Sequence, residues 1–263
     1  MRFVEKLSAV TGIPKEKLPA SYQVLGHIFL AKMLRLNEGE KSAVAKSIME
    51  ILPCVKTVCD ISAVTGELRQ PMITKIAGNG TETIVKEAGI IYRLDAAKIM
   101  FSKGNLTERK RLLSSIMPEE TVIDMFAGIG YFTIGIAKKA KRVIAIEKNP
   151  DAFHYLEENI KLNKLGNVQA INADNREVLI PEKADRIIMG YFPGTEKFLK
   201  IALTMAKSGT IIHYHDICDE SELWGDELRK IHHEIGDFHV ISKKKVKDVA
   251  PRRVHYVVDL KII

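Results

Sequence analysis

The amino-acid sequence predicts an α/β protein whose mostly parallel sheet is preceded by a small α+β domain. The first observation behind this prediction is a short apolar run at 121–123, followed by an acid, two glycines one residue apart and helical apolar spacing. Strand, glycine turn and helix in this order are typical of sheets that bind a ligand at the carboxyl ends of their strands. The second is that short apolar runs and amphipathic segments alternate from there onward, which favours a parallel sheet covered on both faces.

The second part of the chain is expected to contain five strands with helices between them. The strands are expected at 121–123, 142–146, 168–171, 185–190 and 209–214, and the helices at 131–139, 150–162, 195–205 and 225–233. Pro150 suits the first turn of its helix, where its missing N–H needs no partner. Two alternating segments, 239–245 and 254–262, are expected to end the sheet as an antiparallel pair.

The first part of the chain shows a different pattern. Strands are expected at 24–30, 55–61, 72–76, 81–86 and 90–94, with a helix at 41–51 and glycine turns at 78–80 and 88–89. A helix at 106–116 then leads into the first strand of the parallel sheet. Because Gly104 breaks the chain just before that helix, we expect two domains, 1–103 and 104–263.

The composition is that of a globular protein with a proper core. The 263 residues are 46% hydrophobic and 28% charged, and no apolar run approaches the roughly 18 residues of a membrane helix. Charged side chains are spread through residues 1–20, so we expect no signal peptide. Cys54, Cys59 and Cys218 lack zinc-type pairing, which favours a reduced, cytoplasmic protein without a bound metal.

The positive charge of the chain lies in its first part. Residues 1–115 contain 18 Lys and Arg against 11 Asp and Glu, whereas residues 116–263 contain 22 of each. A basic module beside a neutral one suggests that the first holds a polyanion for the second. The alternative is a basic domain with no anionic partner, which charge alone does not exclude.

The glycine turn itself narrows the choice of ligand. Gly128 and Gly130 have no Cβ, so the turn can be tight and a ligand can approach the backbone closely. A dinucleotide site wants a glycine or alanine three residues after the second glycine, but Thr133 stands there. The pattern Asp124-x-Phe126-x-Gly128-x-Gly130 instead resembles motif I of the class I S-adenosylmethionine transferases. This resemblance implies a Rossmann-like fold with S-adenosylmethionine as the ligand.

Two further strand ends carry acids in matching order. The strand at 142–146 is followed by Glu147, where a carboxylate can accept both ribose hydroxyls. The strand at 168–171 is followed by Asp174 and Asn175, and this pair of positions holds adenine in the resembled transferases. Each acid alone is a weak sign, because many strands end in a solvated acid, but three in order favour this cosubstrate.

The junction between the two expected domains holds another candidate. Ser102 offers a hydroxyl, and Arg109 offers a planar, permanently charged fork that suits a carboxylate. The amino-acid end of S-adenosylmethionine carries such a carboxylate. The alternative is that Arg109 pairs with Glu108 or with a phosphate.

These motifs together resemble those of one family. Phe101-Ser-x-Gly-Asn-x-x-Glu-Arg109, the glycine turn, Glu147-x-Asn-Pro150, Asp174-Asn175 and the closing segment 250–256 look like those of the archaeal and eukaryotic enzymes that modify position 37 of tRNA. That family includes N1-guanine methyltransferases and the aminocarboxypropyltransferases of wybutosine synthesis. The resemblance implies a set of residues that bind S-adenosylmethionine: Ser102, Arg109, Asp124, Phe126, Gly128, Glu147, Asp174 and Asn175.

The segment after the fourth expected strand distinguishes the two branches of that family. Methyltransferases of nitrogen atoms usually present Asn or Asp there, followed by Pro, to anchor the target base, but this chain has Gly190-Tyr191. The segment Gly190-Tyr-x-x-x-Thr195, followed by His213-Tyr-His215, resembles the aminocarboxypropyl branch. The alternative is a structural turn at Gly190 with its aromatic residues in the core. Because the acceptor carbon must lose a proton, His215 is one candidate base, and the candidate catalytic residues are Arg109, Tyr191 and His213.

A basic run near the C-terminus comprises Lys243-Lys244-Lys245, Lys247 and Arg252-Arg253. It resembles a surface that contacts phosphates and so positions an RNA without reading its sequence. The alternative is a solvated, charged edge strand.

The resemblance therefore predicts an enzyme of tRNA modification. The predicted reaction transfers the 3-amino-3-carboxypropyl group of S-adenosylmethionine to C7 of 4-demethylwyosine at position 37 of phenylalanine tRNA and releases methylthioadenosine. The alternatives are a tRNA guanine-N1 methyltransferase acting at position 37 and a tRNA-binding protein without turnover, with a dehydrogenase a distant third. The expected partner is the anticodon region of phenylalanine tRNA, and we expect a monomer without membrane contact.

Overall fold

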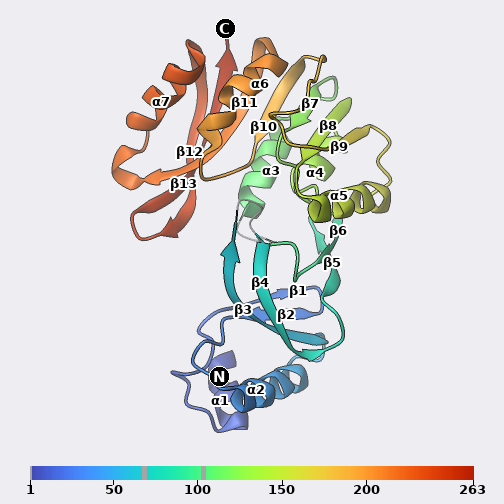
Figure 1. The fold of residues 1–263 in the computed structure, drawn as a ribbon, viewed down its shortest axis with the longest axis vertical. Helices are drawn as coiled ribbons and strands as arrows, with labels where there is room; N and C mark the ends of the chain where they lie inside the picture. The colour runs from blue at the N-terminus through green and yellow to red at the C-terminus, as the bar shows by residue number, and fades with distance from the viewer. Residues whose placement is uncertain (1, 67–69, 102–104) are drawn as a thin grey trace. The chain divides into compact units, whose positions relative to one another are not determined.

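The computed structural model describes residues 2–66, 70–101 and 105–263. The chain divides into two compact units, Met1–Phe101 and Ser102–Ile263, and each has a hydrophobic core of its own (Figure 1). Among the described residues, none of the helices combines the length and the apolar character that a membrane span requires.

The first unit contains a four-stranded sheet, a separate hairpin and two helices. The sheet has the order β1-β2-β3-β4, and β5 pairs with β6. The strands are β1 (Tyr22–Leu25), β2 (Ile28–Ala31), β3 (Thr57–Thr65), β4 (Gln70–Gly78), β5 (Glu82–Glu87) and β6 (Ile90–Asp95), and the helices are α1 (Phe3–Thr11) and α2 (Glu38–Ile51). The helix α2 connects the parallel strands β2 and β3. Leu7 of α1 and Val44 of α2 share one buried core with Phe29 of the sheet.

The predicted strand at 24–30 is wrong. It is two antiparallel strands, β1 and β2, separated by a turn at Gly26-His27. Gly26 adopts a φ of +53°, and a Cβ there would lie 2.1 Å from Thr83 Oγ1. Leu25 and Ile28 are buried on either side of the turn, so the apolar pattern runs straight through it. The helix α1 was not predicted either.

The second unit is built on a seven-stranded sheet in the order β12-β13-β11-β10-β7-β8-β9. Its strands are β7 (Thr121–Asp124), β8 (Arg142–Glu147), β9 (Val168–Asn172), β10 (Ala184–Met189), β11 (Ala206–Asp219), β12 (Phe238–Ala250) and β13 (Arg253–Ile262). Its helices are α3 (Leu106–Ser115), α4 (Thr133–Ala137), α5 (Pro150–Leu162), α6 (Leu199–Met205) and α7 (Asp226–Ile235), with short 3-10 turns η2 (Thr195–Phe198) and η3 (Glu220–Glu222). The strands β7 to β11 are parallel, whereas β13 is antiparallel to both β11 and β12. The predicted parallel sheet with an antiparallel pair at its end is confirmed.

Different helices cover the two faces of this sheet. Neighbouring side chains of a strand point to opposite faces, and β7 shows this clearly. Val122 packs with Leu112 of α3 and Ile136 of α4, whereas Ile123 belongs to the core that contains Leu199 of α6. Figure 1 shows α6 and α7 together beside the antiparallel end of the sheet. The β7 strand is therefore covered from both sides, which explains why its two central residues, Val122 and Ile123, are both apolar and fully buried.

Several elements differ in extent from their predictions, among them β12, which runs to Ala250 rather than to residue 245. The strand β11 runs to Asp219 rather than to residue 214, because it pairs with β13 along its length. The helix predicted at 131–139 is only α4, since the residues after Gly130 still complete the turn. The helix predicted at 195–205 begins as the 3-10 turn η2. By contrast, α5 occupies the predicted residues.

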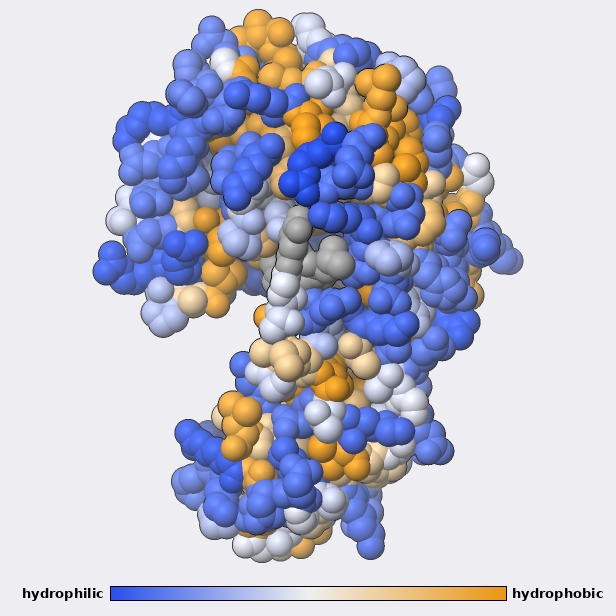
Figure 2. Space-filling model, in the orientation of Figure 1, coloured by the Kyte–Doolittle hydropathy of each residue, from blue (hydrophilic) through white to orange (hydrophobic). Residues whose placement is uncertain are grey.

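The surface of the second unit is mostly hydrophilic on the face that Figure 2 shows. Single apolar side chains remain exposed all the same, and Leu179 is 86% exposed. Leu112 is the opposite case, because it is completely buried between α3 and the sheet.

Leu112→Ala is expected to lower the free energy of unfolding of the second unit by about 2–5 kcal/mol, because it removes buried apolar surface and leaves a cavity. Leu179→Ala makes the same chemical change at an exposed position and should cost about 0.5 kcal/mol or less. Chemical denaturation followed by circular dichroism measures both. Equal effects of the two variants would show that α3 does not pack on the sheet as described.

Candidate active site

The strand β7 is the point at which the strand order of the parallel sheet reverses. The strands β8 and β9 follow on one side of it, and β10 and β11 on the other. Ligands of open α/β sheets bind in the crevice at the carboxyl ends of the strands beside such a point. The glycine turn that follows Asp124 begins there.

Asp124 ends β7 and holds this turn from the inside. Its side chain is fully buried, and its Oδ2 accepts a hydrogen bond of 2.7 Å from the hydroxyl of Thr133. Its Oδ1 lies 3.4 Å from the backbone N–H of Phe126. Burial raises the pKa of Asp124 to about 6, and the hydrogen bonds from Thr133 and Phe126 oppose that rise. Thr133, whose identity argued against a dinucleotide site, is thus a hydrogen-bond partner of Asp124. The side chain of Asp124 faces the turn.

Glu147 ties the turn to the next strand. Its Oε2 accepts a 2.6 Å hydrogen bond from the N–H of Gly128, and its Oε1 accepts one of 2.7 Å from the N–H of Asn149. Burial raises the pKa of Glu147, and these backbone donors oppose the shift. Gly128 and Gly130 have φ values of +57° and +96°, and a Cβ on Gly130 would lie 2.7 Å from Ile134 Cγ1. The turn therefore requires glycine at both positions and presents bare backbone.

Asp174 and Asn175 follow β9 and differ in their partners. Asp174 pairs with Arg176 at 2.6 Å and with Lys148 at 3.0 Å, and the hydrogen bond from Arg176 holds its pKa well below the usual range. The Asn175 amide nitrogen donates to the carbonyl of Met125. Its Oδ1 is buried and finds no hydrogen-bond partner among the described residues. Such an acceptor is costly unless a ligand donates to it, as the amino group of a purine would.

Aromatic rings connect the turn to the loop after β10. Phe126 stacks on Tyr191 with ring centroids 5.0 Å apart and an interplanar angle of 22°. Phe198 meets the Phe126 ring edge-on at 4.9 Å, and Arg176 lies 5.6 Å from the centroid of the Phe198 ring. The structure thus brings the candidate catalytic Tyr191 against a candidate cosubstrate residue.

Arg109 lies near the start of α3 and is buried. Its guanidinium carbon is 6.0 Å from the centroid of the Tyr131 ring, directly after Gly130. This contact brings the predicted carboxylate-binding residue to the glycine turn. Ser102, predicted to act with it, lies outside the described residues.

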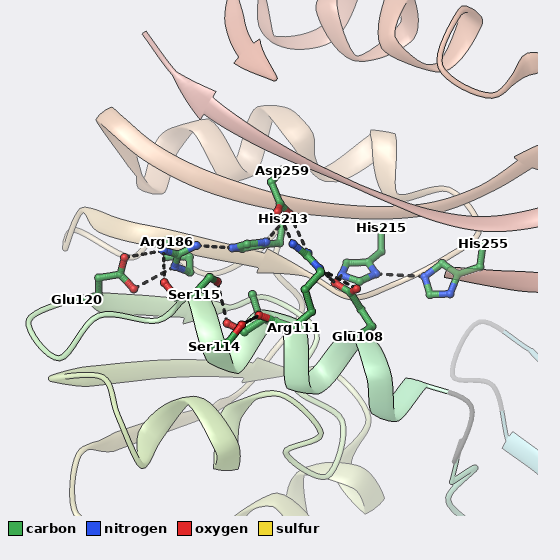
Figure 3. A network of polar contacts seen from close by, with 11 residues as sticks. Glu108, Arg111, Ser114, Ser115, Glu120, Arg186, His213, His215, His255 and Asp259 are labelled. Atoms are coloured by element: carbon green, nitrogen blue, oxygen red, sulfur yellow. Dashed lines mark hydrogen bonds and ion pairs between the residues drawn. The ribbon is translucent and has the colours of Figure 1, made fainter. Parts of the chain in front are cut away.

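A chain of buried charges fastens α3 to the sheet (Figure 3). Glu108 pairs with Arg111 through contacts of 2.7–3.0 Å, and Arg111 reaches Asp259 of β13 at 2.6 and 3.1 Å. At the other end of α3, Arg186 of β10 pairs with Glu120 at 2.7 Å. Charged side chains therefore hold the polar face of α3 where apolar packing would otherwise be needed.

His213 joins the two halves of this chain and has both ring nitrogens engaged. Its Nε2 lies 2.6 Å from Arg186, and because a guanidinium only donates, Nε2 must accept. Its Nδ1 then carries the hydrogen and donates to Asp259 at 2.6 Å. Burial lowers the pKa of His213. Both ring nitrogens of His213 are thus bonded within the protein, and its catalytic role stays a prediction.

His215, the other candidate base, is also buried. Its Nδ1 lies 3.1 Å from His255 Nε2, and burial lowers its pKa well below the ordinary value. Its Nε2 is 3.9 Å from Glu108 Oε1. In the described part of the chain, no group of three or more His, Cys, Asp or Glu side chains is arranged to hold a metal ion.

Asp216 of β11 is a residue that sequence reasoning missed. Its carboxylate accepts from the backbone N–H groups of Gly194 and Thr195 at 3.3 and 3.2 Å and from the Tyr214 hydroxyl at 2.9 Å. Burial raises its pKa to about 6. It therefore anchors the loop that carries Tyr191. The available signal was a charge inside an apolar strand, which also marks two other missed residues of the buried chain, Arg186 and Asp259. Arg111 lies on the polar helix α3 and carried no such signal.

The basic run on β12 is partly engaged with the protein itself. Lys245 pairs with Glu220 at 2.7 Å and with Asp248 at 2.8 Å, and Lys243 lies 5.6 Å from the centroid of the Trp224 ring. These contacts suit the charged edge strand that was the alternative interpretation. Contact with phosphates stays a prediction.

The strand order, the glycine turn and the acids after β7, β8 and β9 define an α/β domain of the S-adenosylmethionine-transferase class. Residues 83–241 match the TRM5/TYW2 methyltransferase domain, and residues 6–81 match the TYW2 N-terminal domain. The chain belongs to the TRM5/TYW2 family.

Its relatives include both branches of that family. It is 44% identical over 246 residues, 91% of this chain and 97% of the relative, to the tRNA(Phe) (4-demethylwyosine(37)-C(7)) aminocarboxypropyltransferase of Methanocaldococcus jannaschii. The crystal structure of Pyrococcus horikoshii TYW2 in complex with MeSAdo has a TM-score of 0.84 at 37% identity and covers 98% of both chains. That of wild-type Trm5b from Pyrococcus abyssi has a TM-score of 0.86 at 36% identity, over 97% of this chain and 80% of that one.

Asp259→Asn is expected to lower the free energy of unfolding by about 3 kcal/mol at neutral pH, because it leaves Arg111 and His213 beside a neutral partner. Burial raises the pKa of Asp259, but hydrogen bonds from His213 and Arg111 outweigh it and hold that pKa below its usual range. The carboxylate therefore stabilises the fold above the ordinary Asp pKa of about 4, and this contribution is lost as the pH falls through the lower folded value. The difference between native and variant should shrink only below about pH 4.

The matched control is Asp226→Asn, which removes an exposed ion pair with Arg229 on α7. Its cost should be about 1 kcal/mol or less. Urea denaturation at several pH values measures both variants. A pH-independent difference for Asp259→Asn, or a control of equal size, would contradict the described network.

Proposed function

We propose that this protein transfers the 3-amino-3-carboxypropyl group of S-adenosylmethionine to C7 of 4-demethylwyosine at position 37 of phenylalanine tRNA. The observation that carries the proposal is the 44% identity, over 91% of this chain, to a relative named for that activity. The loop after β10 supports it, because Gly190 has no side chain with which to hold the edge of a base.

The residues of the turn fit S-adenosylmethionine. Each carboxylate oxygen of Glu147 accepts one backbone N–H and keeps a lone pair for a ribose hydroxyl. The buried Oδ1 of Asn175 suits the amino group of adenine. Arg109 suits the carboxylate of the amino-acid arm, because its charge is permanent and its donors form a planar fork. The remaining residues that we assign to this site are Asp124, Phe126, Gly128 and Asp174, together with Ser102, which lies outside the described residues.

The reaction balances without a metal or an external oxidant. C7 of the acceptor supplies the electron pair for a new bond to Cγ of the arm, and the bond between Cγ and the sulfonium sulfur breaks. Its electrons stay on sulfur, so methylthioadenosine leaves as a neutral thioether, and C7 then loses its proton. Because the sulfonium has three reactive carbons, catalysis is mainly a matter of which one faces the acceptor. Tyr191, stacked on Phe126, is the residue we assign to the acceptor side of the site.

The macromolecular substrate is tRNA, and we assign its anticodon region to the first domain, residues 1–103. The support is the charge excess of residues 1–115 and the match of residues 6–81 to the TYW2 N-terminal domain. The contact with phosphates gives affinity and register without sequence information. We further propose a cytoplasmic monomer, and the free state of all three cysteines supports a reducing compartment.

The second candidate is N1-guanine methylation at position 37. It is favoured by the TM-score of 0.86 to Trm5b and by 37% identity over 96% of this chain to Pyrococcus abyssi Trm5b. The fold is common to both activities, so only the products separate them.

The by-product of the reaction tests the proposal. The protein is incubated with labelled S-adenosylmethionine and with tRNA that carries either 4-demethylwyosine or unmodified guanine at position 37. We expect methylthioadenosine with the first tRNA and no product with the second. Stoichiometric S-adenosylhomocysteine with the guanine tRNA would replace the proposal by methylation, and tRNA binding without either product would indicate a protein without turnover.

Arg109→Ala is expected to lower kcat/KM about a hundredfold, since it removes a charged donor that orients the arm, while the Kd for tRNA stays within about twofold. Lys110→Ala is the matched control, because Lys110 is the exposed neighbour on the same helix. Single-turnover kinetics and a filter-binding assay measure the two quantities. Parallel loss of turnover and tRNA affinity in Arg109→Ala would show instead that Arg109 contacts a phosphate.

A further inference from the structure

The loop after β10 rests on three aromatic rings in succession. Gly190 lies against the Phe132 ring, and Tyr191 stacks on the Phe126 ring at 5.0 Å. The next residue, Phe192, lies 4.3 Å from the ring of His255, with an interplanar angle of 32°. Two of the supporting rings belong to the segment around the glycine turn, and the third belongs to β13.

Close approach explains the glycine in this loop. A Cβ on Gly190 would lie 2.9 Å from Cε2 and 3.3 Å from Cδ2 of Phe132. Carbon atoms at optimal van der Waals separation lie about 3.5–4.0 Å apart, so any side chain at this position must displace the ring or the loop. The backbone of Gly190 is not in the left-handed region, so its conformation alone does not demand glycine.

Phe132 is partly buried, and its ring faces His215 on one side. Its ring centroid lies 5.7 Å from that of His215, which is 1% exposed. His215 is held in turn by His255 at 3.1 Å and lies 3.9 Å from Glu108 (Figure 3). His255 also contacts the ring of Phe192. A shift of the His215–His255 pair would therefore also disturb the Phe192 end of the loop.

We propose that the contact between Gly190 and Phe132 sets the position of the loop after β10 against the glycine turn. Phe132, His215 and His255 are then positioning residues. The proposal rests on the function proposed above, in which the acceptor base lies at this loop. A side chain at position 190 must displace the ring or the loop, and we infer that the loop moves away from the turn, because His215 and His255 support the ring on one side. The acceptor then no longer meets the reacting carbon in line, and displacement by about 1 Å is enough to slow such a step about a hundredfold.

The test compares Gly190→Ala with its rescue. Gly190→Ala is expected to lower kcat about tenfold to a hundredfold, with the Kd for S-adenosylmethionine within about twofold of native. Phe132→Leu removes the ring edge that the new methyl group meets, so the double variant Gly190→Ala/Phe132→Leu should recover most of the lost kcat. The matched control is Gly166→Ala, since a Cβ on Gly166 meets nothing within 4 Å and its φ is not left-handed.

Several results would overturn the proposal. One is a kcat of Gly190→Ala within about twofold of native, and another is a loss of kcat that Phe132→Leu does not reverse. A parallel fall of kcat, cosubstrate affinity and melting temperature would indicate a merely structural role. Should Gly190→Ala fail to fold, Phe192→Leu tests the support of the same loop through the contact of Phe192 with His255. This variant must lower kcat and leave cosubstrate affinity unchanged. The kinetics are followed through whichever by-product the native protein releases, so a wrong assignment of the reaction is recognised separately.

Discussion

The pairing of Glu108 with Arg111, continued to Asp259, is the interaction on which the site depends. Buried ion pairs add little net stability compared with apolar packing, but losing one partner is costly, so they favour a single arrangement. Here that arrangement fixes the rotation and height of α3 on the sheet. Arg109 is the neighbour of Glu108 on this helix, so the direction of its guanidinium follows from the ion pairs that Arg111 makes with Glu108 and Asp259.

In the proposed reaction, contacts of the glycine turn position both substrates. Asp124 accepts a hydrogen bond from Thr133, and Glu147 accepts one from the N–H of Gly128. Neither contact involves a ligand. The side chains of Phe126 and Phe132, which belong to the same segment, contact the loop after β10. In the proposed function, one piece of backbone therefore positions both the cosubstrate and the acceptor, which suits a reaction whose outcome depends on the carbon that is presented.

Regular patterns made the parallel sheet and the strand-end acids predictable from sequence. Glu147, Asp174 and Asn175 were found because the carboxyl ends of parallel strands meet at one edge. The chain from Arg111 to Asp259 was not found, since the pairing spans 148 residues and depends on a register that local periodicity does not reveal. The contact of His213 with Arg186 was not predicted for the same reason, because Arg186 lies on another strand.

The edges of the second sheet have a consequence for the protein in solution. The strands β9 and β12 lie at the two edges, and unpaired N–H and C=O groups there can recruit a strand of another molecule. The strand β12 carries four lysines and has three irregularities in its pairing with β13. Charge and irregular backbone both oppose edge-to-edge pairing. This edge of the sheet is therefore a poor template for a strand of another molecule, although its backbone is unpaired on one side.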